Sequence, residues 1–257
     1  MNITSFVRVL EKQGYSGWKE KLAKMGGLFA EAEYQMVQQG YRRAAIIHIG
    51  ENNYKEMTDK MNRDGLIFTP FLKSGYYKGF SHQHKPVRPG DRYFWYGSLT
   101  KSYKDGQEFK KANEISDHLA YGEFLGYPKC CANYFNDNFS KNYDPIWLEL
   151  EGEVTGYPEA NPLIRYFGVR ITSHFSCSPT CEETRKVGQD WLSVMRGIDP
   201  DLTNELYDLL SQKMRWSSYH GVVEVETPYF VGVTHTHPLI EKSRNIKWTV
   251  KKDNKDN

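Results

Sequence analysis

All four cysteines of the 257-residue chain fall in two short motifs. The first motif is Gly126-Tyr-Pro-Lys-Cys130-Cys131, and the second is His174-Phe-Ser-Cys177-Ser-Pro-Thr-Cys181. Thiolates bind soft metals and attack electrophiles. Each motif has a proline two residues before a cysteine, and proline is favoured at the first position of a helix. The motifs therefore predict helix starts at Pro128 and Pro179, each with a cysteine in its first turn.

A helix N-terminus stabilises a nearby anion such as a thiolate by roughly 0.3–1 kcal/mol. Two such termini that face each other would build one metal site. We expect its ligands to be Cys130, Cys131, Cys177 and Cys181, with His174 completing or tuning it. An iron–sulfur cluster ranks above zinc, because adjacent cysteines are awkward for one tetrahedral ion and the paired spacing typical of zinc is incomplete. A metal-free dithiol ranks third, and four thiols buried as small apolar groups are the structural alternative.

Neighbouring helical residues point about 100° apart. We therefore expect Cys130 and Cys131 to have unequal roles, with one binding the metal and the other facing a substrate cavity. Glu182 and Arg185 complete the set of catalytic candidates. Arg185 lies four residues after Cys181, where it either holds an anionic substrate or pairs with Glu182.

Two His-x-His pairs are second-choice metal ligands. They are His82 with His84 and His235 with His237. Alternate residues on a strand point to the same face, so each pair could chelate a metal. The alternative is that both pairs lie in solvated loops.

The composition is that of a globular protein. Lys and Arg number 34 against 32 Asp and Glu, and 14% of the residues are aromatic, which excludes a disordered chain. Spanning a membrane needs roughly 20 consecutive apolar residues, and the chain has no such run. The net charge of +2 gives no electrostatic support for nucleic-acid binding. A small-molecule partner is therefore favoured.

Cysteine usage and the N-terminus predict a cytoplasmic protein with reduced thiols. Four cysteines are too few for a disulfide scaffold of this size. The first five residues, Met1 to Ser5, lack the basic and apolar regions of a signal peptide.

Hydrophobic periodicity predicts an α+β fold, with helices packed on a small mixed sheet and a β-rich C-terminal segment. Helices are expected within the first forty residues, interrupted at Gly26-Gly27, and over 53–62, 107–125, 128–139, 179–195 and 201–212. Strands are expected over 43–49, 65–72, 92–96, 221–226 and 229–233, with Pro70 favouring an edge strand. A junction near residues 100–106 divides the chain into 1–104 and 105–257, unless both parts form one compact domain.

Together the two motifs, Gly126 to Phe135 and His174 to Cys181, resemble an uncharacterised prokaryotic domain family. That resemblance covers roughly the second half of the chain and implies that the motifs form one site, without implying an activity. The epoxyqueuosine reductase family, with its Cys-Cys and Cys-x-x-Cys motifs on an iron–sulfur cluster, is a looser analogy. In this chain the second pair is Cys177-x-x-x-Cys181, with one more intervening residue than Cys-x-x-Cys.

These observations favour a cytoplasmic metal-dependent enzyme, an oxidoreductase acting on a small or nucleotide-like substrate. One alternative is a non-enzymatic, zinc-stabilised module that binds protein or RNA. Another is a thiol–disulfide or sulfur-transfer protein, with Cys130 as the attacking thiol and Cys131 or Cys181 resolving.

Overall fold

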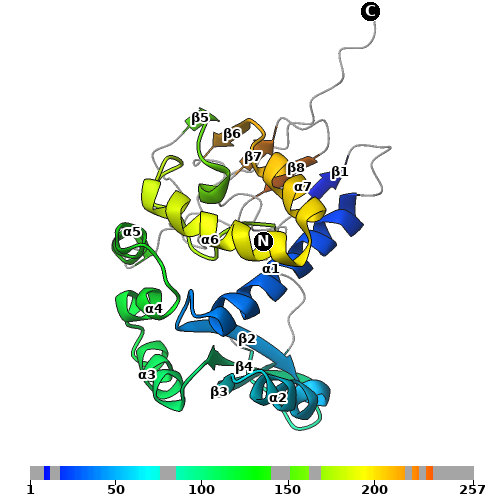
Figure 1. Ribbon diagram of the computed structural model, residues 1–257, viewed down its shortest axis with the longest axis vertical. Helices are drawn as coiled ribbons and strands as arrows, with labels where there is room; N and C mark the ends of the chain where they lie inside the picture. The colour runs from blue at the N-terminus through cyan, green and yellow to red at the C-terminus, as the bar shows by residue number, and fades with distance from the viewer. Residues whose placement is uncertain are drawn as a thin grey trace, which may run out of the picture.

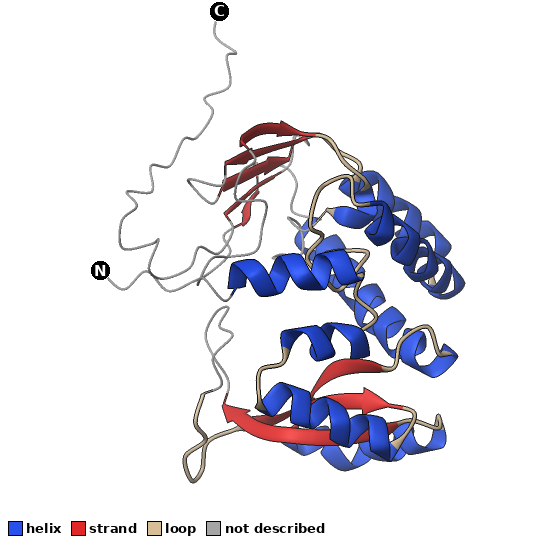
Figure 2. Ribbon diagram, turned by 90° about the vertical axis from the view of Figure 1, so that its left-hand side faces the viewer, coloured by secondary structure: helices blue, strands red, loops and turns tan. Residues whose placement is uncertain are grey.

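The structure, a computed structural model, describes residues 9–11, 18–75, 85–139, 151–161, 169–217, 222–225 and 230–233. Within them the fold is α+β, as the sequence predicts. A three-stranded antiparallel sheet, called the central sheet below because helices pack on both of its faces, lies toward one end of the molecule. A second antiparallel sheet lies toward the other end, with helices between the two sheets (Figure 1; Figure 2).

The described elements have the following bounds. The helices are α1 (Trp18–Gln39), α2 (Tyr54–Arg63), α3 (Tyr103–Glu114), α4 (His118–Phe124), α5 (Lys129–Phe139), α6 (Glu182–Ile198) and α7 (Pro200–Leu210). The strands are β1 (Val9–Glu11), β2 (Ala44–Gly50), β3 (Ile67–Gly75), β4 (Tyr93–Thr100), β5 (Glu151–Val154), β6 (Met214–Ser217), β7 (Val222–Val225) and β8 (Phe230–Val233). Two short 3-10 helices are η1 (Glu51–Asn53) and η2 (Pro158–Ala160).

The central sheet has the strand order β2-β4-β3, and the second sheet has the order β1-β8-β7-β6-β5. Pro70 lies on β3, at the edge of the central sheet, and the register shifts between Pro70 and Leu72. Because proline has no N–H to donate to a ladder, an edge strand with a bulge accommodates it. The predicted edge position of this strand is confirmed.

Apolar side chains from the two faces of the central sheet pack against different helices. Ala45, Ile49 and Leu99 are buried together with Val37 of α1 and Met61 of α2. On the opposite face, Ala44 is buried with side chains of the α3–α4 region, including Phe109, Phe124 and Leu125. Alternation along β2 thus sends successive residues to opposite cores.

Helix α1 links the central sheet to the rest of the molecule. Its residues Met25, Phe29 and Met36 are buried against α6 and α7, and the Phe29 ring stacks on Trp191 with centroids 4.9 Å apart. This core joins parts of the chain on both sides of residue 104, and the division of the chain into 1–104 and 105–257 stays a prediction.

Two helix predictions for the first 125 residues differ from the structure. Helix α1 runs through Gly26 and Gly27 without a break. A Cβ at Gly27 would meet nothing within 4 Å, so no close packing requires this glycine. The single helix predicted over 107–125 is two helices, because Ser116 adopts a positive φ of 56° and the Asp117 side chain then caps α4 through the Ala120 N–H. An aspartate N-cap starts a new helix whatever the apolar spacing around it.

Candidate metal centre

Cys130 and Cys131 lie in the first turn of α5, where the sequence predicts a helix start. Helix α4 ends at Phe124, and Gly126 follows its C-cap with a φ of 66°, which is favourable for glycine; the Gly126 N–H donates to the Glu123 carbonyl oxygen. Pro128 follows two residues later, and its carbonyl oxygen accepts the first helical hydrogen bond from Ala132 N–H, at 2.9 Å. The glycine stop and the proline start thus fix where the cysteine pair is presented.

Cys177 and Cys181 come from the segment before α6. The helix begins at Glu182 rather than at Pro179, so the predicted start is three residues early. Cys181 is the N-cap, with its sulfur accepting from the Thr184 N–H at 3.5 Å, and its own N–H donates to the Ser178 carbonyl oxygen. Pro179 instead sits in the turn before the helix.

A second segment holds this turn in place. The Tyr157 N–H donates to the Pro179 carbonyl oxygen at 2.9 Å. A Cβ at Gly156 would clash with that carbonyl group, so only glycine allows this approach. The turn that carries Cys177 and Cys181 is therefore positioned by contacts on both sides.

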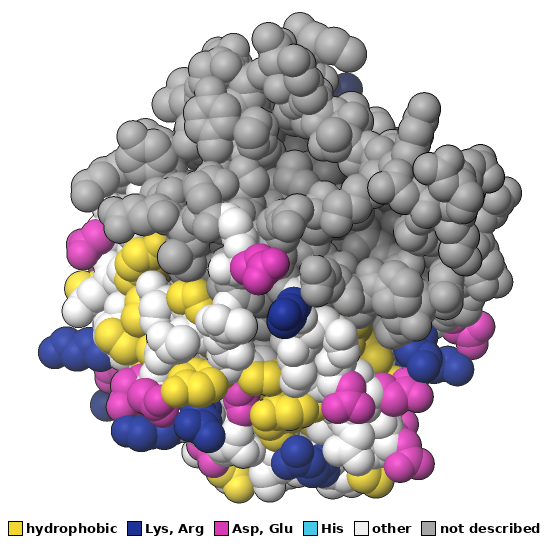
Figure 3. All heavy atoms as spheres, turned by 90° about the horizontal axis from the view of Figure 1, so that it is seen from above, with side chains coloured by type: hydrophobic (Ala, Val, Ile, Leu, Met, Phe, Trp, Pro, Cys, Tyr) yellow, Lys and Arg dark blue, Asp and Glu magenta, His cyan; other side chains and the backbone are white. Residues whose placement is uncertain are grey.

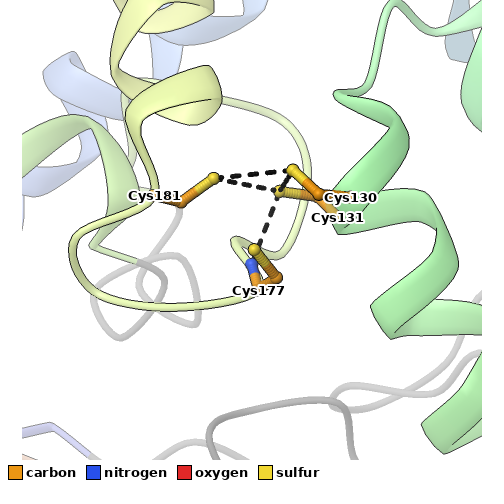
Figure 4. A group of neighbouring side chains, drawn as sticks. All are labelled: Cys130, Cys131, Cys177 and Cys181. Atoms are coloured by element: carbon orange, nitrogen blue, oxygen red, sulfur yellow. Dashed lines mark hydrogen bonds between the residues drawn. The ribbon is translucent and has the colours of Figure 1, made fainter.

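The four sulfur atoms meet between α5 and the start of α6 (Figure 4). All four lie within 4.8 Å of one another, so the group could hold a metal ion. Cys181 Sγ is 3.7 Å from both Cys130 Sγ and Cys131 Sγ, which are 3.8 Å apart. All four cysteines are free thiols. The predicted proximity of the two motifs is confirmed.

Helix geometry predicts that Cys130 and Cys131 point in different directions. In the structure both sulfurs instead turn toward the same centre. The centre lies off the N-terminal end of α5, and side chains of adjacent residues in a first turn can both bend toward it. The two residues differ in burial instead. Cys130 is exposed, whereas only 1% of Cys131 is accessible.

Hydrogen bonds and burial shift the pKa values of three of the thiols. Burial raises the pKa of Cys131 far above that of an ordinary thiol. Burial and the neighbouring Cys181 thiol raise the pKa of Cys177 to about 12. Burial acts the same way on Cys181 and is the largest single effect, but hydrogen bonds from Thr184, Cys177 and Cys131 together outweigh it, and the pKa of Cys181 falls to about 7. Cys181 is therefore the most readily ionised of these three.

His174 is not among the described residues whose ligand atoms converge, and it lies behind the sulfurs, beyond Thr184. Its Nε2 is 2.9 Å from Thr184 Oγ1, and that hydroxyl oxygen is 3.2 Å from Cys131 Sγ. His174 is buried, with the Tyr127 ring 5.3 Å away between centroids. Thr184 was not identified from the sequence. Its place three residues after the N-cap Cys181 is the signal that could have indicated it.

Glu182 and Arg185 are exposed at the start of α6, and both contact the half-buried Tyr157. Arg185 Nη1 is 3.7 Å from Glu182 Oε2, and its guanidinium lies 4.7 Å from the centre of the Tyr157 ring. The Tyr157 hydroxyl donates to Glu182 Oε1. The pairing of Arg185 with Glu182, one of the two roles expected for it, is present.

The two His-x-His pairs, His82 with His84 and His235 with His237, lie outside the described residues. Their assignment as second-choice ligands stays a prediction.

Arg42 ties the two cysteine-bearing parts together. Its Nε donates to the Leu125 carbonyl oxygen at the end of α4, at 2.7 Å, and its Nη1 pairs with Glu33 of α1 at 2.8 Å. The guanidinium lies 5.2 Å from the Trp191 ring centre on α6. One buried side chain thus connects α1, the α4–α5 corner and α6.

Comparison with protein-family models found no match, and neither the curated proteins nor the solved structures gave a significant similarity. Among the described residues, no helix has the length and apolar character needed to cross a membrane.

Proposed function

We propose that the chain is a metal-binding protein in which Cys130, Cys131, Cys177 and Cys181 hold a single ion between α5 and α6. The spacing of the sulfurs carries this proposal. Metal–sulfur bonds of roughly 2.3 Å in a tetrahedron put the sulfurs about 3.8 Å apart. The sulfurs of Cys130, Cys131 and Cys181 are separated by 3.7, 3.7 and 3.8 Å.

The same spacing favours one ion over the iron–sulfur cluster ranked first from the sequence. In a four-iron cluster each thiolate binds a different iron, so the ligands stand around the whole cluster and lie farther apart than on one ion. Here all four sulfurs fall within 4.8 Å. Tetrahedral sites of four sulfurs are typical of zinc or iron, and we rank zinc first.

The donor set suggests what the ion does. Four protein thiolates close a tetrahedral ion and leave no position for substrate, as in structural sites. The ion would join the first turn of α5 to the turn before α6, two segments about fifty residues apart in sequence. A structural role fits these contacts best.

An oxidoreductase remains the second candidate, favoured by one observation. Cys130 is exposed, so a redox partner or a small substrate can approach one edge of the centre. If the bound ion is iron, the four thiolates leave no open position on it. Electron transfer is then the reaction that the site allows. Glu182 and Arg185 keep their candidate roles in contacting a substrate there.

The surface of the described residues carries charges of both signs. On the face in Figure 3, basic and acidic side chains of the described residues are interspersed with hydrophobic ones. This mixture agrees with the net charge of +2 and gives no support to a nucleic-acid partner. We therefore keep a small molecule or a protein as the proposed partner. Free thiols are typical of a reducing compartment, which supports a cytoplasmic location.

Metal analysis of the full chain, purified without oxygen, tests the proposal. We expect about one metal ion per chain. Zinc leaves the protein colourless, whereas iron bound to thiolates gives visible absorption bands. The Cys131→Ser variant should lose the metal, and the Ser193→Ala variant, at an exposed position on α6, should keep it. Several iron ions with inorganic sulfide, or no metal in the parent protein, would contradict a single-ion site.

A further inference from the structure

Cys130 differs from the other three cysteines in its exposure to solvent. Cys131 and Cys181 are buried, Cys177 is half-buried and Cys130 is exposed. Its sulfur nevertheless lies within the cluster, 3.7 Å from Cys181 Sγ (Figure 4). Oxidation of cysteine follows thiolate character and access. A thiolate held by the metal and open to solvent is therefore where a dissolved oxidant first meets the centre.

We propose that Cys130 is an oxidation site, at which hydrogen peroxide converts two metal-binding thiolates into a Cys130–Cys181 disulfide and releases the metal. This inference rests on the metal site proposed above. It assigns to one of its ligands a second role, that of a peroxide-reactive thiol.

The reaction has two steps. The Cys130 thiolate attacks one peroxide oxygen, the O–O bond breaks, hydroxide leaves, and Cys130 becomes a sulfenic acid. The Cys181 thiolate then attacks the Cys130 sulfur, the S–S bond forms, and a second hydroxide leaves. Each hydroxide takes up a proton from solvent. The two sulfurs together lose two electrons, and the peroxide gains them as it becomes two water molecules.

Backbone geometry selects Cys181 as the second sulfur. Cys131 is equally near Cys130, but the Cα atoms of adjacent residues are about 3.8 Å apart. A disulfide usually needs a Cα separation of roughly 4.4–6.8 Å. A Cys130–Cys131 bond would also have to form within the first turn of α5. Cys181 approaches from a different element, so its bond to Cys130 needs no distortion within one helix.

The disulfide would remove two of the four ligands from the ion. Cys131 and Cys177 remain, and two thiolates cannot close a tetrahedral site. The metal therefore leaves as the disulfide forms. The new bond joins α5 to the N-cap of α6, so the covalent link replaces the metal link between the same two elements.

Peroxide treatment of the metal-loaded full chain tests the inference. Metal release is followed with a chromogenic chelator, and disulfides are mapped by mass spectrometry of a non-reducing digest. We expect one metal ion released for each disulfide formed, with Cys130–Cys181 as the main bond. A different main bond, or metal release without a disulfide, would overturn the proposal.

Two variants separate the steps. In Cys181→Ser the Cys130 sulfenic acid has lost its partner, so a dione probe should label Cys130 after peroxide treatment. Cys130→Ser lacks a metal ligand, so it is compared with the parent protein after metal removal from both. Peroxide should consume its thiols at least about tenfold more slowly, because the remaining thiols are less accessible. Thiol loss at the parent rate would show that Cys130 is not the site.

Alkylation of the native parent protein gives a measurement that depends on no variant folding. Iodoacetamide should modify Cys130 about tenfold faster than any other cysteine, and equal rates would contradict the proposal. Metal content before treatment separates the two proposals. A metal-free parent that forms the Cys130–Cys181 bond contradicts the metal site alone, and a metal-loaded parent that resists peroxide contradicts the oxidation site alone.

Discussion

The central sheet and the cysteine-bearing junction between α5 and α6 are held together by different means. Strands β2, β4 and β3 have apolar clusters on both faces, with Leu99 and Phe109 fully buried. At the junction between α5 and the segment that leads into α6, the polar contacts of the described residues include four thiols, the Thr184 hydroxyl and the His174 ring. Burial of apolar surface stabilises the first region without help. In the second region the four thiols repel one another once they are ionised. A bound metal cation would attract all four thiolates.

Removal of the metal should have the largest effect, and it should be confined to one region. Binding of structural zinc by thiolates contributes on the order of 10 kcal/mol at neutral pH. A chelator should therefore lower the melting temperature and increase hydrogen exchange in α5 and around Cys177 to Cys181. Strands β2 and β4 should keep their protection. Equal loss of protection in both regions would show that they do not differ in this way.

Replacement of Arg42 should affect both regions, because this residue contacts α1, the end of α4 and α6. The Arg42 side chain is 2% exposed, and Glu33 is 16% exposed. Arg42→Met leaves a largely buried carboxylate without its cation, which costs about 3–5 kcal/mol of unfolding free energy. Chemical denaturation measures this loss, and metal titration should show weaker binding.

The double variant Glu33→Gln with Arg42→Met is the matched control. It removes both charges, so much of the lost stability should return. If the double variant is as unstable as Arg42→Met, the loss comes from packing of the arginine and not from the unpaired charge.

Leu99→Ala should destabilise the central sheet without affecting the metal site. Leu99 is fully buried, and removing its side chain should cost about 2–5 kcal/mol of unfolding free energy through lost burial and the cavity left behind. Metal content and metal affinity should stay at parent values. A loss of metal in this variant would mean that the sheet and the junction unfold together.

The same contrast explains what could be predicted from the sequence. Apolar spacing located the strands of the central sheet, and Pro70 indicated its edge strand, since local patterns largely determine these elements. The pairing was not predicted: the sheet is antiparallel and not mixed, because strand direction depends on contacts between distant segments. The Pro-x-Cys spacing shared by the two motifs was enough to predict that their cysteines meet. The inward turn of both Cys130 and Cys131 could not be predicted, because it depends on where α6 lies in space. The role of Thr184 was missed for the same reason.

Thr184→Val should have the smallest effect of these changes, and it tests whether the hydroxyl between His174 and Cys131 supports the metal site. Valine keeps the shape of the side chain and removes the group that lies 2.9 Å from His174 Nε2 and 3.2 Å from Cys131 Sγ. Loss of a partner behind a metal ligand typically weakens metal affinity by about 10-fold or more. Competition with a chelator of known affinity measures this change.

Thr184→Ser restores the hydroxyl and should recover most of the affinity. Thr203→Val, at another buried threonine whose hydroxyl bonds only the Asp199 carbonyl oxygen among the described contacts, should destabilise the protein without changing metal affinity. If Thr184→Val and Thr203→Val behave alike, the hydroxyl contributes to packing and hydrogen bonding in the fold, and the polar contacts behind the sulfurs do not distinguish the junction from the rest of the molecule.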